Sequence, residues 1–597
     1  MDGTRALAVT EEPVVWRRST SARQPVPEVL TDCLVNEGVE FVFGVPGGAI
    51  IPILESMERT GRIRFVLARH ESGAAFMADC YARVRGGIGV CLATTGPGAT
   101  NLLTGVAAAY ADSIPLLVLT GMTPTHSWGM GDFQESTLHG IDTVGLFRHV
   151  TKRSEAVVSE KLLQPMLRRA FSSARSGRPG PVHLAIPRDV LGRSVSPDCW
   201  PAPTYHSHPP GPSVEDVARV VHALDTAERP LIIVGSGASL EAAANLCALS
   251  NHLAVPLIAT PRAKGLFSAS PARYYLGTMG ISANARVDRF LSAAGCDLVL
   301  AIGSGFGRYA TNSWDPCLRQ GRMIQVNIDP DAIGRVYPAD LGIVSDAALF
   351  TRALMDRLVP AGEAPPGDPD PQIRSRVRWI EPYLAARDSE SWPVSPEVPG
   401  GRLSPVDIIR AVHRAVPARG IILVDSGSML LWATHYLPEG RARRFIGVWG
   451  AASMGHVTAG AVGAKLAAPD RAVLALVGDG CFLMNGMEVA TAVQHQLALV
   501  WVVNVNQQLG MIHYEQRASG LTAASELGRC DIAQIALGLG ARGVICRDFT
   551  TLVSAIVEGF TRVGPTVIQV DVDPEPVPPI GQKKAGSARW LEYIDSI

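Results

Sequence analysis

The sequence predicts an α/β fold that occurs three times along the chain, each time as a doubly wound parallel sheet. Short apolar runs without polar alternation recur throughout the 597 residues, and such runs are typical of strands that helices cover on both faces. Helical patterns separate these runs, for example at 74–84 and 100–111. Two Pro-rich stretches, 194–213 and 359–402, divide the chain into three blocks of domain size.

These boundaries give an expected order of domains, linkers and tails. In chain order we expect a flexible tail at 1–23, a first domain at 24–193, a linker at 194–213, a central domain at 214–358, a linker at 359–402, a third domain at 403–580 and a tail at 581–597. The expected strands lie at 41–45, 64–68, 88–94, 115–120, 231–235, 298–303, 323–329, 420–425, 473–478 and 499–505. The rhythm of the first and third blocks is similar enough to predict two related folds.

Composition excludes several classes of protein. A hydrophobic fraction of 47% argues against a disordered chain, and 54 basic against 55 acidic residues give no charge imbalance that would attract nucleic acid or a membrane surface. The most apolar run, 497–503, is too short to span a bilayer, and the first 23 residues lack the apolar core of a secretory signal. Ten cysteines without a CxxC pair are typical of reduced thiols. We therefore expect a cytoplasmic enzyme with no nucleic-acid or membrane partner.

A Gly-flanked carboxylate follows one strand of the third block, and an amide follows the next strand. Asp479 comes directly after the run 473–478, and Asn506 comes directly after the run 499–505. Between them Asn485 is predicted to open a helix that runs to about residue 496, with Glu488 as its capping-box partner. Carboxyl ends of successive parallel strands face one crevice, where a carboxylate and an amide oxygen favour Mg²⁺ and backbone N–H groups favour phosphate. The alternative is that Gly-Asp-Gly is merely a turn.

This stretch resembles the thiamin-diphosphate motif, in which GDG is followed by a distant Asn. The resemblance implies that Mg²⁺ is bound by the side chains of Asp479 and Asn506 and by the backbone carbonyl of Gln508. It departs from the motif at Cys481, where a Ser is usual, and at Ser428, where the first residue of a Gln-His pair is usual. The cofactor-binding residues that the resemblance implies are Gly47, Pro97, Asn101, Ser428, Met454, Gly478, Gly480, Cys481, Gly510 and Met511.

Glu71 is the candidate group that activates this cofactor. It follows the run 64–68 at the start of a predicted helix, where by itself a Glu more often compensates the helix dipole. The segment 69–75 matches the pyrimidine-domain signature of the family, and a carboxylate bonded to N1′ of the pyrimidine favours the imino form that removes the thiazolium C2 proton. Met454 matches the residue that props the cofactor in its bent conformation. In this family Glu71 and Asp479 serve one site from different subunits, which implies a homodimer or a homotetramer.

Within the family, the first block is most similar to the large subunit of acetolactate synthase (acetohydroxyacid synthase). Matching segments lie at 44–50, 67–71, 95–102, 133–135 and 176–182, and the resemblance covers roughly 26–580. It implies decarboxylation of a 2-oxo acid donor such as pyruvate and transfer of the remaining acyl unit to a small carbonyl acceptor. Phe133 and Gln134 match catalytic residues of a loop that closes over the donor.

The departures from the family concern the acceptor. The family Arg that holds the carboxylate of a second 2-oxo acid falls at Gly305, and the family Trp that selects this substrate falls at Glu515. Losing a cation and gaining an anion disfavours a carboxylate acceptor, so we expect an aldehyde, ketone or polyhydroxylated carbonyl compound instead of a second pyruvate. The candidate residues of the acceptor pocket are Arg188, Arg308, His513 and Glu515.

Three alternatives remain open for the function. An ordinary acetolactate synthase would have drifted at these positions, whereas a 2-oxo acid decarboxylase would use His139, His513 or Glu515 as proton donor. A non-catalytic regulator would keep the fold without the chemistry.

FAD is a separate prediction. The resemblance places Arg178, Gly235, Gly237 and Asp329 at expected FAD contacts of the central domain, but the motif is incomplete, and the alternative is an empty domain.

Overall fold

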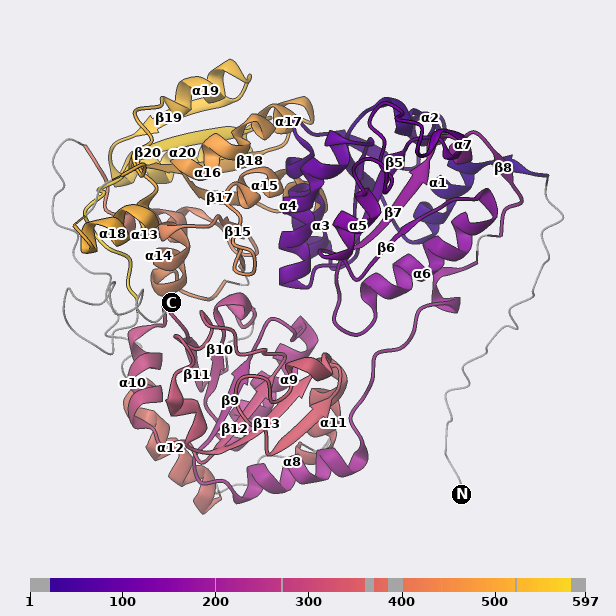
Figure 1. The fold of residues 1–597 in the computed structure, drawn as a ribbon. Coiled ribbons are helices and arrows are strands. Elements are labelled where there is room, and N and C mark those ends of the chain that lie inside the picture. Colours follow the sequence, from indigo (N-terminus) through magenta and orange to yellow (C-terminus); the bar gives the residue numbers. More distant parts are fainter. Residues whose placement is uncertain are drawn as a thin grey trace, which may run out of the picture.

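The computed structural model describes residues 22–198, 200–269, 272–359, 370–384, 401–441, 443–520 and 523–580. Three six-stranded sheets, all with parallel neighbours, organise these residues, which confirms the predicted fold class. In Figure 1 the first sheet and its helices lie beside the third, and the second lies below both.

The first sheet has the strand order β3-β2-β4-β5-β7-β6. Its strands are β2 (Phe41–Val45), β3 (Arg64–Leu67), β4 (Gly89–Ala93), β5 (Leu116–Met122), β6 (Arg153–Ala156) and β7 (Val182–Pro187). Its helices are α1 (Val26–Asn36), α2 (Ile51–Thr60), α3 (Glu71–Arg85), α4 (Pro97–Asp112), α5 (Thr143–Arg148), α6 (Leu163–Arg175) and α7 (Arg188–Leu191). Alternate residues of β5 enter two different apolar cores, Leu117 on one face and Val118 on the other, so helices cover both faces of the sheet.

The third sheet repeats this connectivity with the order β16-β15-β17-β18-β20-β19. Its strands are β15 (Ile421–Val424), β16 (Arg444–Gly447), β17 (Val473–Gly478), β18 (Leu499–Val505), β19 (Arg542–Cys546) and β20 (Thr566–Asp571). Its helices are α13 (Pro405–Ala415), α14 (Ser428–Tyr436), α15 (His456–Ala467), α16 (Asp479–Asn485), α17 (Val489–Gln494), α18 (Gly510–Ala518), α19 (Ile532–Gly538) and α20 (Phe549–Thr561). Numbered from its own first strand, each of the two sheets runs 2-1-3-4-6-5, which supports the prediction of two related folds.

The second sheet has a different order, β11-β10-β9-β12-β13-β14. Its strands are β9 (Pro230–Val234), β10 (Leu257–Ala259), β11 (Tyr275–Thr278), β12 (Leu298–Ile302), β13 (Arg322–Asn327) and β14 (Leu341–Val344). Its helices are α8 (Val214–Thr226), α9 (Leu240–Leu253), α10 (Ala285–Ala293), α11 (Ala347–Leu358) and α12 (Pro371–Leu384). Counted within the sheet this order is 3-2-1-4-5-6, the order of dinucleotide-binding folds.

The prediction that Asn485 opens a helix was wrong. Helix α16 begins at Asp479, directly after β17, and Asn485 is its last residue. Glu488 ends a short 3-10 turn (Gly486–Glu488), and α17 ends at Gln494. The carboxylate of Glu488 accepts the backbone N–H groups of Arg69 and His70 from the first domain, so a distant partner replaces the expected local cap.

Regular structure occurs inside both stretches that were predicted as linkers. The strand β8 (Ser194–Val195) pairs antiparallel with β1 (Gln24–Pro25). Helix α12 lies within 359–402, and its buried Arg376 donates to the carbonyl groups of Leu224, Ala227 and Leu253 in the central domain. The domain boundaries themselves stay predictions, and the tails at 1–21 and 581–597 lie outside the described residues.

A buried network of charged side chains joins the three domains. Arg83 of α3 bonds Asp79 at 2.5 Å and Asp112 at 2.8 Å. Arg262 of the central domain contacts Asp112 at 3.1 Å, and His456 of α15 contacts Asp79 at 2.9 Å. Because both carboxylates are buried and paired, this network fixes α3 relative to the other two domains.

Two further expectations can be compared with the structure. Over the described part of the chain, no helix combines the length and the apolar character that crossing a membrane needs. Every cysteine in these segments is free, in agreement with reduced thiols.

His183 of β7 is a fully buried titratable group in the first domain. Its Nε2 lies 2.8 Å from Thr120 Oγ1, its Nδ1 lies 2.8 Å from Ser154 Oγ, and its ring stacks on Phe147. Burial lowers the pKa of His183 from 6.5 to about 3. The folded protein therefore keeps this ring neutral at pH values where the unfolded chain protonates it.

We predict that acid destabilises the protein through His183. Since the folded pKa lies below the unfolded pKa, stability that is complete above pH 6.5 is lost as the pH falls towards 3. Between about pH 7.5 and about pH 5 the loss from this group is on the order of 2 kcal/mol. Urea unfolding of the parent and of a His183→Gln variant at both pH values measures it. An equal loss in the two proteins would contradict the assignment.

Candidate active site

Asp479 lies at the carboxyl edge of the third sheet. Its side chain is buried, and its two oxygens accept the N–H groups of Gly480 at 2.9 Å and Gln507 at 2.7 Å. Burial raises the pKa of Asp479 to about 6, against these N–H groups, which lower it. The bond to Gln507 brings the end of β17 against the residues that follow β18, as the parallel order predicts.

The residues after β18 form a tight turn beside Asp479. Asn506 Oδ1 accepts the N–H of Gln508 at 3.2 Å, and Gln507 has a φ of +60°. Backbone bonds from Leu509 to Ser525 and from Leu527 to Gln507 hold this turn in place. A buried carboxylate and an amide oxygen therefore lie beside the same turn, and among the described residues Asp479 has N–H donors but no ion-pair partner. This donor set fits Mg²⁺.

Two helix starts meet next to Asn506. Helix α14 begins at Ser428 and α18 begins at Gly510. A Cβ atom built on Gly510 would lie 3.1 Å from Asn506 Nδ2 and 3.4 Å from Ser428 Oγ, so these three residues are neighbours. A Cβ atom built on Gly478 would meet nothing within 4 Å, which leaves open space beside the turn. Backbone N–H groups at such helix starts fit a diphosphate.

Three further residues that were predicted to bind the cofactor have different surroundings. Met454 is half-buried, and its methyl carbon lies 3.0 Å from a Cβ atom built on Gly480. Cys481 is buried and directs its thiol to the carbonyl oxygen of Ser426 at 3.1 Å, while burial raises the pKa of the thiol. Met511 packs at the edge of an apolar core.

Glu71 is the first residue of α3, as the sequence predicts. Its Oε2 accepts a hydrogen bond from Asn101 of α4 at 2.9 Å. The loop before α4 approaches closely: a Cβ atom on Gly98 would lie 3.4 Å from Glu71 Oε1 and 2.8 Å from Thr94. A Cβ atom on Gly47 would lie only 2.4 Å from Thr94, and Pro97 opens α4. The segment from Gly98 to Asn101 therefore approaches the oriented carboxylate of Glu71, and the Gly47 loop packs on Thr94 just before it.

The loop that carries Phe133 and Gln134 closes onto this Gly-rich segment. Thr95 Oγ1 donates to the carbonyl oxygen of Gln134 at 3.1 Å, and Gln134 has a φ of +58°. Gly96 is required by this approach, because a Cβ atom there would lie 2.9 Å from that of Gln134. Phe133 is 82% exposed.

The two halves of the predicted cofactor site are separate within one chain. Glu71 contacts Asn101, and Asp479 contacts the 506–508 turn. No contact between the described residues joins Glu71 to Asp479.

The residues predicted for the acceptor pocket come from three domains. Arg188 opens α7 and is exposed, and Arg308 turns towards Ser313, with Nε 3.4 Å from its Oγ. His513 and Glu515 lie on α18, where His513 Nδ1 is 3.4 Å from Ser525 Oγ. No hydrogen bond or ion pair among the described residues joins these four side chains.

Arg335, which no motif of the sequence indicates, lies against Gly305, the residue at which the resemblance places the family Arg. Its Nη2 is 3.1 Å from a Cβ atom built on Gly305 and 3.5 Å from the Gly305 carbonyl oxygen. The guanidinium therefore occupies space that a side chain at Gly305 would fill. Only a contact between segments 30 residues apart reveals it.

The four residues predicted for FAD already have protein partners. A Cβ atom on Gly235 would lie 2.2 Å from the Gly303 carbonyl oxygen, and one on Gly237 would lie 3.0 Å from Gly303. Arg178 Nη1 lies 3.7 Å from Asp329 Oδ2. Both glycines are explained by the close approach of two backbone loops at the point where the strand order reverses.

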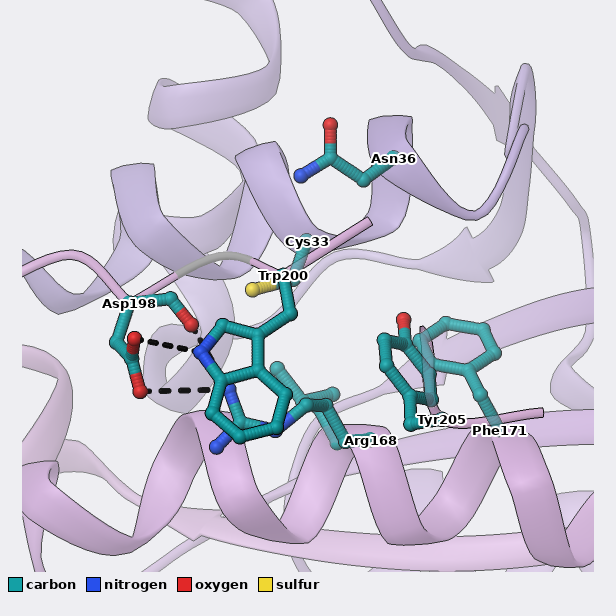
Figure 2. A pocket seen from close by; sticks show the side chains of 8 residues that line it. Cys33, Asn36, Arg168, Phe171, Asp198, Trp200 and Tyr205 are labelled. Atoms are coloured by element: carbon teal, nitrogen blue, oxygen red, sulfur yellow. Dashed lines mark hydrogen bonds and ion pairs between the residues drawn. The ribbon is translucent and has the colours of Figure 1, made fainter. Parts of the chain in front are cut away.

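Two other groups of residues lie apart from this site. Asp79, Cys80 and His456 bring three potential metal ligands within 4.8 Å, but Arg83 and His456 already occupy Asp79. A pocket between α1, α6 and the chain at 198–205 is shown in Figure 2, where Asp198 binds Trp200 and Arg168. None of the predicted site residues lines that pocket.

Three family models match the chain and define its class. The description "Thiamine pyrophosphate enzyme, N-terminal TPP binding domain" matches residues 25–144, the central domain of the same enzymes matches 217–354, and their C-terminal TPP binding domain matches 425–570. Thiamine pyrophosphate is thiamin diphosphate, so the matches confirm the cofactor that the Gly-Asp-Gly motif predicted. The protein is a thiamin-diphosphate-dependent enzyme.

Curated relatives narrow the class. The acetolactate synthase isozyme 1 large subunit of Escherichia coli is 32% identical over 93% of this chain and 95% of its own length. A probable acetolactate synthase large subunit of Methanocaldococcus jannaschii is 30% identical, with 93% and 94% covered, and the large subunit of Parasynechococcus marenigrum is 32% identical, with 91% and 86% covered. The chain belongs to the acetolactate synthase large-subunit family, which confirms the predicted resemblance.

We predict that Asn101 is needed to orient Glu71. Removing its side chain in Asn101→Ala takes away the hydrogen bond to the carboxylate, and a bond to a charged group contributes about 1.5–3 kcal/mol, which is roughly 10- to 150-fold in rate. Turnover should fall by this factor while the fold is kept. Thr100→Ala is the matched control, because Thr100 bonds only the carbonyl of Pro97 at the surface. Equal turnover in the two variants would contradict the role of Asn101.

Proposed function

We propose that the protein is a carboligase that decarboxylates pyruvate or another 2-oxo acid and transfers the acyl unit to a carbonyl acceptor other than a second pyruvate. The observation that carries the proposal is the pair of ordered carboxylates, Glu71 on Asn101 and Asp479 on the 506–508 turn. Each lies at the carboxyl edge of its own parallel sheet, where ligands bind in such folds.

The third domain would hold the cofactor by its charged end. Mg²⁺ would bind Asp479, Asn506 and the carbonyl of Gln508, and the starts of α14 and α18 would receive the diphosphate. When bound, thiamin diphosphate supplies a carbon nucleophile and an electron sink for the departing CO₂. Met454, whose methyl carbon lies next to Gly480, would support the cofactor.

The first domain would hold the aminopyrimidine. Asn101 donates to one oxygen of Glu71 and fixes it. The other oxygen would be left for the pyrimidine nitrogen, so this bond would determine the atom of Glu71 at which a proton is held. Phe133 and Gln134 would exclude water above the reacting carbon, because their loop rests on the Gly-rich segment beside Glu71.

The complete site would need two copies of the chain, in a homodimer or a homotetramer. Glu71 of one copy would face Asp479 of the other, which agrees with the lack of contact between them among the described residues of one chain. Apolar side chains on the loop of Phe133 and around the end of α16 are left exposed: Phe133 at 82%, Met484 at 58% and Met487 at 52%. A second copy would cover them.

The acceptor would be a neutral carbonyl compound. Gly305 supplies no cation of its own, and Glu515 adds a carboxyl group on α18. A carboxylate acceptor would need a buried cation to offset its desolvation. We further propose a cytoplasmic location, as the composition and the reduced cysteines suggest.

A true acetolactate synthase is the second candidate, and one observation favours it. The guanidinium of Arg335 lies against Gly305 and brings a cation to the place where the family Arg is missing. A carboxylate acceptor could then be bound by a residue from another segment.

Incubation of the purified protein with pyruvate, thiamin diphosphate and Mg²⁺ tests the proposal. We expect CO₂ release that Glu71→Gln abolishes, with little acetolactate unless an aldehyde is added, in which case the mixed ligation product forms. Rapid acetolactate formation from pyruvate alone would establish the second candidate. No CO₂ from any 2-oxo acid would refute both.

FAD binding is proposed on the strand order of the central domain alone, because the predicted contact residues are engaged with protein. Bound flavin would colour the purified protein, because a flavin cofactor absorbs visible light. A colourless protein that stays colourless after incubation with FAD would contradict this part of the proposal.

A further inference from the structure

The first and third domains of one chain contact each other where Glu71 begins its helix. Helix α3 packs along α15, and the two backbones come closest at Gly463, where a Cβ atom would lie 2.0 Å from the Met77 carbonyl oxygen. A Cβ atom on Gly460 would lie 2.4 Å from Cys80 Sγ. The middle of α3 is therefore held by α15 of its own chain, and Figure 1 shows the two helices side by side.

Glu488 is the residue of the third domain that reaches this start. It is 1% exposed, and its Oε1 accepts the backbone N–H groups of Arg69 at 2.9 Å and His70 at 3.1 Å, the two residues before Glu71. Its Oε2 accepts from Thr491 Oγ1 at 2.7 Å. Gly73 is required beside it, because a Cβ atom there would lie 2.2 Å from Oε1.

Neighbouring contacts hold the same turn from both sides. Ser72 Oγ donates to Asn485 Oδ1 at 3.3 Å, and Arg69 Nη2 donates to Gln494 Oε1 at 2.9 Å. Thr491 Oγ1 also lies 3.2 Å from the carbonyl oxygen of Leu67 at the end of β3. These contacts come from the segment that begins with Asp479 and runs through α16 to α17.

We propose that Glu488 is a positioning residue that fixes the 69–71 turn and thereby orients the carboxylate of Glu71 in the same chain. This inference rests on the proposed function. Glu71 would complete its site with Asp479 of the partner subunit, and Glu488 acts on that site. The Asp479 that begins α16 in the same chain as Glu488 would serve the other site of the dimer.

The physical basis is the pairing of two backbone N–H groups with one buried oxygen. Burial raises the pKa of Glu488, and the bonds from Thr491, Arg69 and His70 lower it. Oε1 accepts the two N–H groups in either protonation state, so the contact depends on an oxygen acceptor of this shape and not on charge. Glutamine supplies the same acceptor, whereas alanine leaves both N–H groups without a partner.

Amide hydrogen exchange of the cofactor-free protein is the first test. Glu488→Ala should increase the exchange of Arg69 and His70 by at least about tenfold, and Glu488→Gln should keep it within about threefold of the parent. Thr491→Val is the matched control, because it alters the same pocket and leaves Oε1 in place. Unchanged exchange in Glu488→Ala would overturn the proposal.

The second readout is the rate at which the C2 proton of bound thiamin diphosphate exchanges with deuterium. In Glu488→Ala a displaced Glu71 should slow this exchange about 10- to 100-fold, while the Kd for thiamin diphosphate changes far less. Glu488→Gln should restore the exchange rate of the parent. A loss of affinity with normal exchange in the bound fraction would show a merely structural role and overturn the proposal.

Mixed dimers separate this inference from the proposed function. One chain carries Glu71→Gln and the other carries Asp479→Asn, so only one shared site is intact. No recovery of activity on mixing would refute the shared site itself.

With recovery established, Glu488→Ala is added to either chain. On the chain with the intact Glu71 it should abolish most of the recovered activity, and on the chain with the intact Asp479 it should leave most of it. Equal effects in the two placements would overturn the assignment of Glu488 to Glu71 while leaving the shared site standing.

Discussion

The constraint on which the site depends is the junction at which β17 ends and α16 begins. It buries the carboxylate of Asp479 and gives it two N–H donors, Gly480 and Gln507, with no ion-pair partner among the described residues. Burial raises its pKa to about 6, so the cofactor-free fold holds this group at a cost in free energy. A divalent cation would offset that cost. The same bond to Gln507 shapes the turn after β18, so the proposed metal site and the fold would share one contact.

Much of this arrangement follows from local sequence. The apolar runs predicted ten of the eighteen strands of the three sheets, each to within about two residues, and Glu71 was predicted at the start of its helix, because strand burial and helix starts are local properties. The partner of Glu488 could not be predicted in this way. Its donors lie 418 and 419 residues away, and a capping-box pattern cannot compete with backbone N–H groups that the fold brings to the same carboxylate. Helix α12 was missed for a similar reason: Arg376 is anchored by carbonyl groups of the central domain.

The central domain shows why a glycine motif is weak support for a nucleotide. Its strand order is that of dinucleotide-binding folds, and Gly235 lies at the reversal point. Yet the structure explains this glycine by the backbone of Gly303, which leaves no space for a Cβ atom. A sequence records that a residue must be small, and it does not record whether a ligand or another loop approaches it.

The residues proposed for donor chemistry are therefore held more firmly by the fold than the residues proposed for acceptor selection. Donor chemistry would use two carboxylates at strand ends, Glu71 held by the side chain of Asn101 and Asp479 held by two backbone N–H groups. Such positions follow from the α/β frame. Acceptor selection would use loops and a short helix from different domains, where Arg335 can cover Gly305 without changing any strand. A cation carried by one loop can replace a cation carried by another, so under the proposed function the absence of a cation at Gly305 would bear on acceptor charge only together with the position of Arg335.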